Sequence, residues 1–290
     1  MLLLSLALCQ SACAQGKLAL TGGVASVDGA GGGGLSPWAL TATPASEGEQ
    51  GLAAFASHLK TRDYRLEVQG LAWVWDDRIE LSLARQRLHT GSSLAALGLE
   101  GLVLQQQILG LKWKVAGDAV LDADRWMPQI AVGLLHKRTQ AGALAPTLHG
   151  PLGADRQGNE LYVAATKLWL DWGLLGNLTL RATRANQGGL LGFGGAQDRR
   201  WRLQPELSLA WLLSPRLAAG LEVRAKPNAL ERSVLGAGAL REDDWFDVFL
   251  AWAPHKQVTL TVAAVDLGAI APALRPKRQR GAYLSIQGSF

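Results

Sequence analysis

Gly281 to Phe290 reads Gly-Ala-Tyr-Leu-Ser-Ile-Gln-Gly-Ser-Phe, and this closing stretch decides the fold class. Residues at alternate positions fall into an apolar set and a more polar set. The apolar set is Ala282, Leu284, Ile286, Gly288 and Phe290, and the other set is Tyr283, Ser285, Gln287 and Ser289. A period of two predicts a strand whose two faces meet different surroundings.

A last strand that is apolar outward and ends in an aromatic residue resembles the final strand of bacterial outer-membrane β-barrels. In those proteins the terminal aromatic belongs to the signal read by the barrel assembly machinery, so the resemblance makes that machinery a partner of Phe290. Gly288 departs from the bulky residue usual at its position. Taken alone, the stretch leaves open an ordinary C-terminal strand of a soluble sheet.

The first fourteen residues are predicted to be a cleaved secretory signal. A leucine-rich core precedes Ala12-Cys13-Ala14, which has the small-x-small pattern of a cleavage site. No basic residue precedes the core, so the natural start is left open. A lipoprotein that uses Cys13 and a structural helix are the alternatives. Cleavage after Ala14 would remove both cysteines and leave no disulfide or thiol chemistry.

The composition favours a membrane barrel over a helical membrane protein. Hydrophobic residues make up 48% of the chain, yet mean hydropathy is only +0.09 because apolar and polar residues are interleaved. Such interleaving is what a transmembrane barrel needs, since lipid-facing and lumen-facing residues alternate. The formal net charge of +5 and the absence of an aromatic-basic module argue against a nucleic-acid partner.

Period-two runs predict about fourteen strands in residues 15–290. They are 18–28, 35–43, 51–61, 64–75, 78–88, 103–117, 127–139, 160–171, 176–186, 199–213, 216–226, 244–253, 256–267 and 281–290. The connections between them alternate between short and long, as in outer-membrane barrels with short periplasmic turns and long outer loops. We therefore predict an all-β, antiparallel, up-and-down transmembrane barrel. A twelve-stranded barrel with Leu18 to Thr43 as a plug is the alternative.

Tryptophan and basic residues sort to opposite ends of the predicted strands. Eight tryptophans lie beside short turns and predict an inner interfacial girdle: Trp73, Trp75, Trp113, Trp126, Trp169, Trp172, Trp211 and Trp252. Basic residues flank the long loops, where lipopolysaccharide phosphates or water would meet them. The predicted lipopolysaccharide-facing residues are Arg138, Arg199, Arg200, Lys277, Arg278 and Arg280.

Charged residues on the polar faces of four predicted strands are predicted to line a pore. They are Arg65, Glu67, Glu80, Arg202, Glu206, Arg216, Glu222 and Arg224. The turn at Ser214-Pro215 predicts that Glu206 lies opposite Glu222, with Arg202 near Lys226 and Arg224. Like charges facing one another would require water or counter-ions, which predicts a hydrated lumen with mild anion preference. Pairing into a network that closes the lumen is the alternative.

Several stretches resemble one proteobacterial family, domain of unknown function 3034. Among them are Leu20-Thr21-Gly22-Gly23-Val24, Ala164-Ala165-Thr166-Lys167, Leu190-Leu191-Gly192-Phe193-Gly194-Gly195, Lys226-Pro227-Asn228 and Val265-Asp266-Leu267-Gly268. The likeness spans Leu18 to Phe290 and implies an exported outer-membrane protein. It brings no known activity or catalytic residues.

The sequence predicts no catalytic residue, metal site or cofactor. The five histidines are isolated, and no nucleophile-elbow sequence is present. The preferred function is passive passage of a small hydrophilic solute through the outer membrane. A structural or adhesive surface barrel with a closed lumen is the alternative, and an outer-membrane enzyme is third. The glycine-rich stretches Gly29–Gly34 and Asn186–Gln197 are candidates to fold inward, although a flexible outer loop is the alternative for the second.

Overall fold

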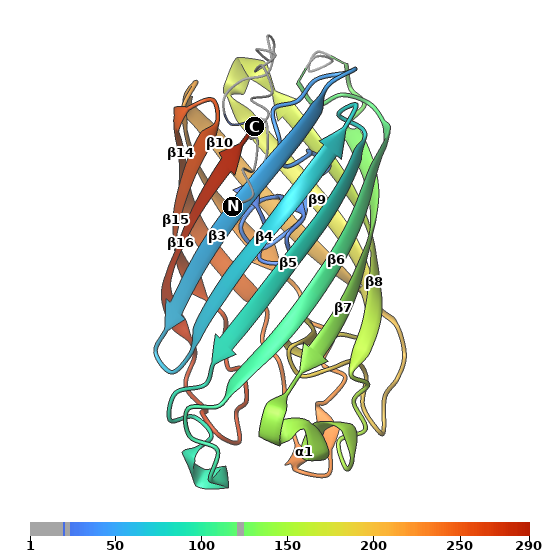
Figure 1. The fold of residues 1–290 in the computed structure, drawn as a ribbon, viewed down its shortest axis with the longest axis vertical. Helices are drawn as coiled ribbons and strands as arrows, with labels where there is room; N and C mark the ends of the chain where they lie inside the picture. Colours follow the sequence, from blue (N-terminus) through green and yellow to red (C-terminus); the bar gives the residue numbers. More distant parts are fainter. Residues whose placement is uncertain (1–19, 21–23, 121–124) are drawn as a thin grey trace, which may run out of the picture.

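The computed structural model describes residues 20, 24–120 and 125–290, and these form a closed antiparallel barrel of twelve strands (Figure 1). The strands are β3 (Gln50–Thr61), β4 (Arg65–Trp75), β5 (Ile79–His89), β6 (Val103–Ala116), β7 (Gln129–Gln140), β8 (Gln157–Trp169), β9 (Leu174–Thr183), β10 (Arg202–Ser214), β11 (Leu217–Arg224), β14 (Trp245–His255), β15 (Val258–Asp266) and β16 (Arg280–Ser289). Each strand pairs with the next barrel strand in sequence, and β16 pairs with β3 to close the barrel.

The remaining elements are short and lie inside the barrel or in its connections. They are β1 (Val24–Ala25), β2 (Gly31–Gly32), β12 (Arg232–Ser233), β13 (Gly236–Ala237), α1 (Ala145–His149) and the 3-10 turns η1 (Ala95–Leu97), η2 (Gly142–Leu144), η3 (Leu170–Trp172) and η4 (Asn186–Gly189). Among the described residues, none of these helices has the length and apolarity required to span a bilayer.

The outer wall is apolar and the inner wall is polar, as alternation predicts. On β16, Leu284 and Ile286 are half exposed, whereas Ser285 and Gln287 are buried. Phe290 follows β16 and is exposed, and its backbone exchanges hydrogen bonds with Leu52 of β3 at 2.7 and 2.8 Å. The predicted faces of the closing strand are therefore confirmed, and the C-terminal residue also helps to close the barrel.

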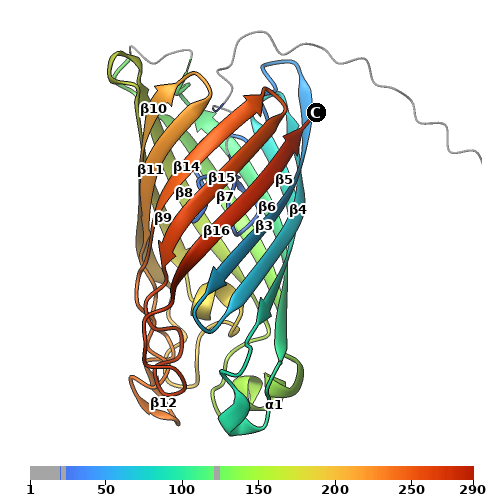
Figure 2. The ribbon, with the colours of Figure 1, turned by 90° about the vertical axis from the view of Figure 1, so that its left-hand side faces the viewer.

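The ends of the barrel differ as the sequence predicts. The long connections, with α1 and β12, gather at the end opposite the C-terminus (Figure 2). All eight tryptophans of the predicted girdle are exposed, from 40% at Trp169 to 90% at Trp126. Exposed indoles beside the short turns are the arrangement expected at a membrane–water interface. Because outer-membrane barrels have short periplasmic turns and longer extracellular loops, we assign the end with the long connections as the outer end.

The prediction of fourteen strands is wrong, because its first two runs do not join the wall. The other twelve predicted runs correspond to the twelve barrel strands. Within the first two, only Val24–Ala25 is assigned to a strand in the described residues, and it pairs with Gly31–Gly32 rather than with the barrel. Every residue from Ala25 to Thr43 is buried, and Figure 1 shows this stretch between the front and back walls. We call residues 25–43 the inner segment. The predicted signal lies outside the described residues.

Candidate functional site

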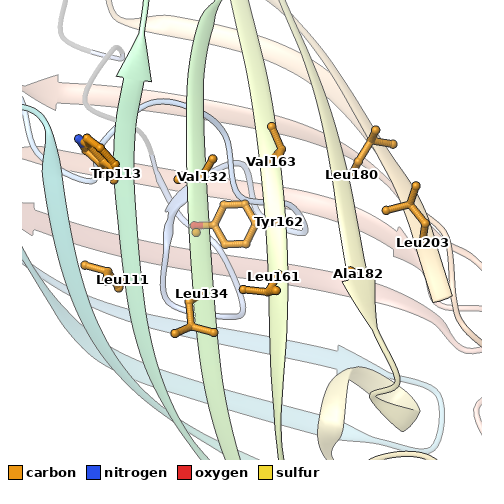
Figure 3. Close-up of a pocket in the computed structure, with 11 residues that line it drawn as sticks. Leu111, Trp113, Val132, Leu134, Leu161, Tyr162, Val163, Leu180, Ala182 and Leu203 are labelled. Atoms are coloured by element: carbon orange, nitrogen blue, oxygen red, sulfur yellow. The ribbon is translucent and has the colours of Figure 1, made fainter. Parts of the chain in front are cut away.

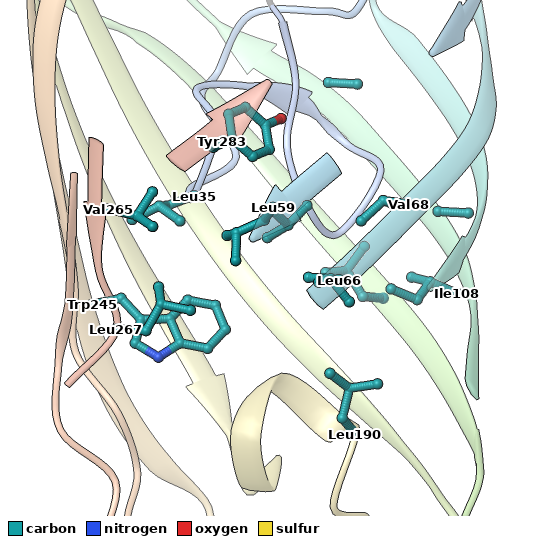
Figure 4. Close-up of a cluster of buried hydrophobic side chains, with 14 of the residues drawn as sticks. Leu35, Leu59, Leu66, Val68, Ile108, Leu190, Trp245, Val265, Leu267 and Tyr283 are labelled. Atoms are coloured by element: carbon teal, nitrogen blue, oxygen red, sulfur yellow. The ribbon is translucent and has the colours of Figure 1, made fainter. Parts of the chain in front are cut away.

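The lumen of the barrel is filled by the inner segment and by side chains of the wall. The apolar residues of the inner segment, including Leu35 and Trp38, belong to a buried cluster that also contains Leu59 and Leu66 of the wall (Figure 4). Most of the inner segment, however, is glycine, alanine, serine or threonine. Contacts of its main chain therefore decide how it is held.

Wall side chains accept hydrogen bonds from the backbone of the inner segment. Both carboxylate oxygens of Glu80 are used, one by Gly31 N at 2.9 Å and the other by Ala42 N at 2.7 Å. Glu222 accepts from Leu35 N at 2.8 Å. Further acceptors are Gln287 for Ala25 N at 2.7 Å and Thr166 for Ala39 N at 2.8 Å. A buried segment that is not paired with the strands of the wall needs such substitutes for ladder bonds.

Other wall side chains donate to the carbonyl groups of the same segment. Lys112 Nζ donates to Gly31 O at 2.5 Å and to Leu40 O at 2.8 Å. The remaining donors are Gln86 to Val27 O, Gln129 to Ala39 O, Thr179 to Pro37 O, Arg224 to Leu35 O and Gln287 to Ala42 O. The polar lining of the barrel is thus matched to one conformation of the inner segment.

The glycine run allows the segment to approach the wall and itself closely. A Cβ at Gly32 would lie 2.3 Å from Ser36 O and 2.5 Å from Trp38 N. A Cβ at Gly33 would lie 2.1 Å from a carboxylate oxygen of Glu222. Neither space admits a side chain, so the low complexity of this stretch has a packing cause.

Asp28 of the inner segment is held by three cations of the wall. Lys137 Nζ donates to one carboxylate oxygen at 2.7 Å. The other oxygen lies 2.9 Å from Arg224 Nη1 and 3.4 Å from Arg181 Nη2. These side chains come from β7, β9 and β11, so a single aspartate links three strands of the barrel.

Two wall carboxylates balance the same cations. Glu160 lies 2.6 Å from Lys137 and 3.1 Å from Arg181, and Glu206 lies 2.6 Å from Arg181 and 3.3 Å from Arg224. We call this set the ion cluster: Asp28, Lys137, Glu160, Arg181, Glu206 and Arg224. Its three positive and three negative charges cancel, which makes their burial possible.

The connection from β9 to β10 reaches into the lumen from the outer end. Lys137 Nζ, which holds Asp28, also donates to Gly188 O at 3.0 Å, and Thr139 donates to Gly189 O at 2.5 Å. Phe193 is fully buried. The interpretation of Asn186–Gln197 as an inward-folding stretch is thus confirmed for Asn186 to Gly195, most of which is buried, while Ala196 and Gln197 are exposed.

A buried ion pair, Lys226 and Glu242, holds the connection from β9 to β10 at the outer end of the strands. Gln187 N donates to Glu242 at 2.9 Å, and Glu242 lies 3.4 Å from Lys226 Nζ. The ammonium of Lys226 also lies 3.7 Å from the ring of Trp245. Burial lowers the pKa of Lys226 to about 8 and raises the pKa of Glu242.

Lumen-facing polar side chains all round the barrel are almost inaccessible to water. Glu80, Lys137, Glu222, Asp247 and Ser285 each expose 1% or less of their surface, and they come from β5, β7, β11, β14 and β16. An open pore would leave such side chains wet. In the part of the chain that the structure describes, these lumen-facing groups are therefore shielded from water.

The structure places the predicted pore-lining residues in three environments. Glu80, Glu206, Glu222 and Arg224 face the lumen and are buried. Arg202 faces Asp198 near the outer mouth. The remaining three, Arg65, Glu67 and Arg216, do not face the lumen: the first two lie on the outer surface and the third in a short turn. On β4 it is Leu66 and Val68 that point inward, because the lumen there holds apolar parts of the inner segment.

The predicted pairing of β10 and β11 is also wrong, by two residues. Glu206 lies opposite Arg224, and Ser208 lies opposite Glu222. The tight connection at Pro215-Arg216 and an irregularity between Leu212 and Ser214 set this register. Glu206 therefore faces an opposite charge, and the predicted Glu206–Glu222 pair does not form. Glu222 instead lies opposite Asp247 of β14, and both carboxyl groups are buried.

Sequence reasoning found Arg224 but missed the other two cations of the ion cluster. Arg181 alternates with Leu178 and Leu180 and could have been assigned to the lumen from that pattern. Lys137 could not, because it lies between His136 and Arg138 and all three are basic. Asp28 was assigned to a wall strand.

The six predicted lipopolysaccharide-facing residues are all exposed. Arg278 and Arg280 lie about Asp266, at 3.0 and 2.9 Å, and Arg199 and Arg200 pair with Asp155 and Asp198. Their exposure agrees with a role at the membrane surface, while contact with lipopolysaccharide stays a prediction.

Two grooves lie on the outer wall rather than in the lumen. One, of about 600 Å³, is apolar and lies between Trp113, Leu134 and Leu161, and the ring of Tyr162 also lines it (Figure 3). It belongs to the lipid-facing belt. Among the described residues, no group of three potential His, Cys, Asp or Glu ligands could hold a metal ion. That the protein is not an enzyme stays a prediction.

Several solved outer-membrane barrels share this fold. The KdgM porin matches with 10% identity and a TM-score of 0.51, covering 82% of this chain and 99% of its own. The NanC porin matches with 8% identity and a TM-score of 0.53, covering 82% and 98%. The COG4313 outer membrane channel from Pseudomonas putida F1 matches with 13% identity and a TM-score of 0.51, covering 85% and 97%.

At these identities the likeness concerns the fold. The closed barrel, its apolar belt and its tryptophan girdle place the protein in the bacterial outer membrane. No functionally curated protein matches the chain. The family model "Protein of unknown function (DUF3034)" matches residues 21–287. The chain therefore belongs to the DUF3034 family, as the sequence resemblance indicated.

Proposed function

We propose that this protein is an outer-membrane channel for small hydrophilic solutes, and that the inner segment is the gate that closes it. In the state described here the gate is shut. Passage requires the inner segment to leave its seat on the lumen wall.

The observation that carries the proposal is how the inner segment is held. Its main chain bonds to wall side chains such as Glu80, Lys112 and Glu222, and few large apolar residues anchor it. Each such hydrogen bond contributes only about 0.5–1.5 kcal/mol net, because water can replace either partner. The wall would therefore become a hydrated polar lining once the segment moved. A core made to stay filled would use bulky apolar side chains instead.

The charges that remain on the lumen wall when the inner segment leaves indicate which solute charge the channel would favour. Without Asp28, the ion cluster keeps Lys137, Arg181 and Arg224 against two carboxylates. Within the ion cluster one positive charge is then in excess, which supports a mild preference for anions at that level, while Glu222 and Asp247 add acidic groups to the neighbouring wall. A small neutral or weakly anionic solute is the class that we propose.

The second candidate is a structural barrel with a permanently filled lumen. It is favoured by the close match between the wall and the backbone of the inner segment, including both oxygens of Glu80. The two candidates differ in whether the intact chain ever admits solute.

Swelling of proteoliposomes separates them. Vesicles with the intact chain should swell slowly in a small neutral sugar, and those with Asp28→Asn, which weakens the seat, should swell faster. Larger sugars should enter less well in both cases. If neither protein admits sugar although both are folded, the lumen is permanently filled and the channel proposal fails.

A further inference from the structure

The outer wall carries a basic surface that extends unusually far into the lipid-facing belt. On β4 the outward apolar residues are Trp75, Trp73 and Leu71, and polar residues begin at Gln69. On β5 the apolar run ends at Leu83. By contrast, outward residues of β10 stay apolar from Trp211 through Leu209, Leu207, Pro205 and Leu203 to Trp201.

The outward apolar runs of β4 and β5 are shorter than the hydrocarbon layer of a bilayer requires. A tilted strand needs about 9–11 residues, or roughly five outward positions, to cross the hydrocarbon layer. The β10 side meets that length, whereas β4 and β5 supply three apolar positions. Polar side chains on the second side would therefore lie at the depth of outer-leaflet acyl chains unless something covers them.

The exposed polar residues form a continuous row across adjacent strands. Gln69 lies opposite Arg85, Arg85 opposite Gln107, and Gln107 opposite Arg138. A groove of about 820 Å³ runs below this row, between Arg85, Arg138 and the apolar side chains of Leu71, Leu83 and Leu109. Because Gly70 has no side chain, the ring of Phe55 forms the floor of the groove. One site thus offers an apolar slot beneath cationic and amide groups.

Charge decides what can occupy this site. Outward residues on β3 to β7 include Lys60, Arg65, Arg85, Arg87 and Arg138, with Glu67 as the acidic member. Glu67 is already engaged by Arg65 at 3.5 Å and His89 at 3.4 Å. Within the described residues, Arg85 and Arg138 form no salt bridge. A second copy of the chain would bring like charges together across a two-fold axis.

We propose that this groove, which we call the basic groove, binds a phosphorylated glycolipid of the lipopolysaccharide class. Arg85 and Arg138 pair with its phosphate groups, and one acyl chain lies along Leu71, Leu83 and Leu109. Arginine suits phosphate because its planar guanidinium donates two parallel hydrogen bonds. The inference is independent of the channel proposal, since it concerns the opposite face of the wall.

The test uses the intact folded chain in detergent and native mass spectrometry. Diphosphoryl lipid A, monophosphoryl lipid A and phosphatidylethanolamine serve as probes. We expect retention of one lipid A molecule, with affinity falling in that order. Arg85→Gln with Arg138→Gln should weaken diphosphoryl lipid A binding at least about tenfold, which corresponds to about 1.4 kcal/mol. Arg216→Gln with Lys256→Gln removes the same charge at the other end and should change binding less than about twofold, the spread typical of surface substitutions.

A second variant tests the row without removing an arginine. Gln107→Glu places a carboxylate between Arg85 and Arg138 and should weaken lipid A binding comparably, while far-ultraviolet circular dichroism stays unchanged. The proposal is overturned if either basic-groove variant binds lipid A as the parent does, or if phosphatidylethanolamine binds equally well. A dimer that disappears in Arg85→Gln with Arg138→Gln would identify the surface as a protein contact and would equally overturn it.

Discussion

Lys137 and Asp28 are joined by a hydrogen bond of 2.7 Å, and this pair marks where the two obstructions of the lumen meet. Asp28 belongs to the inner segment, and Lys137 belongs to the wall strand β7. The same ammonium donates to Gly188 O, in the connection that enters from the outer end. One side chain thus holds both the inner segment and the connection from β9 to β10.

Replacing Asp28 by Asn should loosen the gate. The change leaves three wall cations facing two carboxylates, and breaking a buried ion cluster in this way costs about 3–5 kcal/mol. If even about 1.4 kcal/mol of that falls on the seating of the inner segment, openings in planar bilayers should become about tenfold more frequent. Glu47→Gln removes a carboxylate from an exposed position and should leave the frequency unchanged. Equal frequencies in the two variants would show that Asp28 does not hold the gate.

A methyl group at Gly32 should disturb the seat of the inner segment, whereas one at Gly34 should not. The added Cβ at Gly32 meets backbone atoms at 2.3 Å, whereas at Gly34 the nearest atom lies at an ordinary 3.5 Å. Overpacking of this kind costs about 1–3 kcal/mol. Limited proteolysis should therefore cut the inner segment faster in Gly32→Ala than in Gly34→Ala. Identical cleavage rates would argue against a tightly seated segment.

The lipid-facing belt can be tested with one substitution at two depths. Leu207 lies in the belt of β10, and Leu213 lies at its short-turn end. Arginine at a mid-membrane outward position costs about 2–4 kcal/mol, and near the interface about 0–1 kcal/mol. Urea titration in lipid vesicles should show the larger loss for Leu207→Arg. A larger loss for Leu213→Arg would mean that the membrane lies elsewhere on the barrel.

Leu221→Arg and Glu222→Arg, at neighbouring positions of β11, would be the corresponding comparison of an outward with an inward residue. The structure makes the second change a poor control, because Glu222 accepts hydrogen bonds from Leu35 N and Ser208 within the lumen. Loss of those contacts would destabilise the barrel for reasons unrelated to lipid.

The Lys226–Glu242 pair predicts a dependence of stability on alkaline pH. Burial lowers the pKa of Lys226 to about 8, while an unfolded chain keeps the lysine pKa at about 10.4. Between these values the unfolded state binds more protons, so the contribution of Lys226 to stability rises with pH. Unfolding titrations from pH 7 to pH 10 should show this rise in the parent protein.

Two variants serve as controls for this pair. Lys226→Met should abolish the alkaline rise and leave Glu242 buried without its cation, which costs about 3–5 kcal/mol at pH 7. Lys226→Met with Glu242→Gln should recover most of that loss. An alkaline rise that persists in Lys226→Met would assign it to another group.

Alternation predicted the wall because each barrel strand separates lipid from a polar lumen along its whole length. Twelve of the fourteen predicted runs are therefore strands of the barrel. The same reasoning offered the inner segment as a plug only in its twelve-stranded alternative, since Ser26 and Asp28 alternate with Ala25 and Val27 as strand residues do. The inner segment is held by wall side chains such as Glu80 and Lys112, and no local sequence pattern predicts which wall residues these are.

The faces of β4 show a second limit of alternation. Leu66 and Val68 point inward while Arg65 and Glu67 point outward, because the lumen is locally apolar and the outer wall is locally polar. Hydrophobicity alone assigns the reverse. The ion cluster required three-dimensional information too, since it combines one residue of the inner segment with wall residues on β7 to β11.

The most direct test of the account is a planar-bilayer comparison of the intact chain with a variant in which residues 25–43 are replaced by a short glycine-serine linker. The intact chain should be closed most of the time and open briefly. The variant should conduct in steady steps of the same unit size as those brief openings, with a mild anion preference from the unbalanced Lys137, Arg181 and Arg224. Steady conduction by the intact chain, or silence from a folded variant, would contradict the claim that the inner segment is the gate.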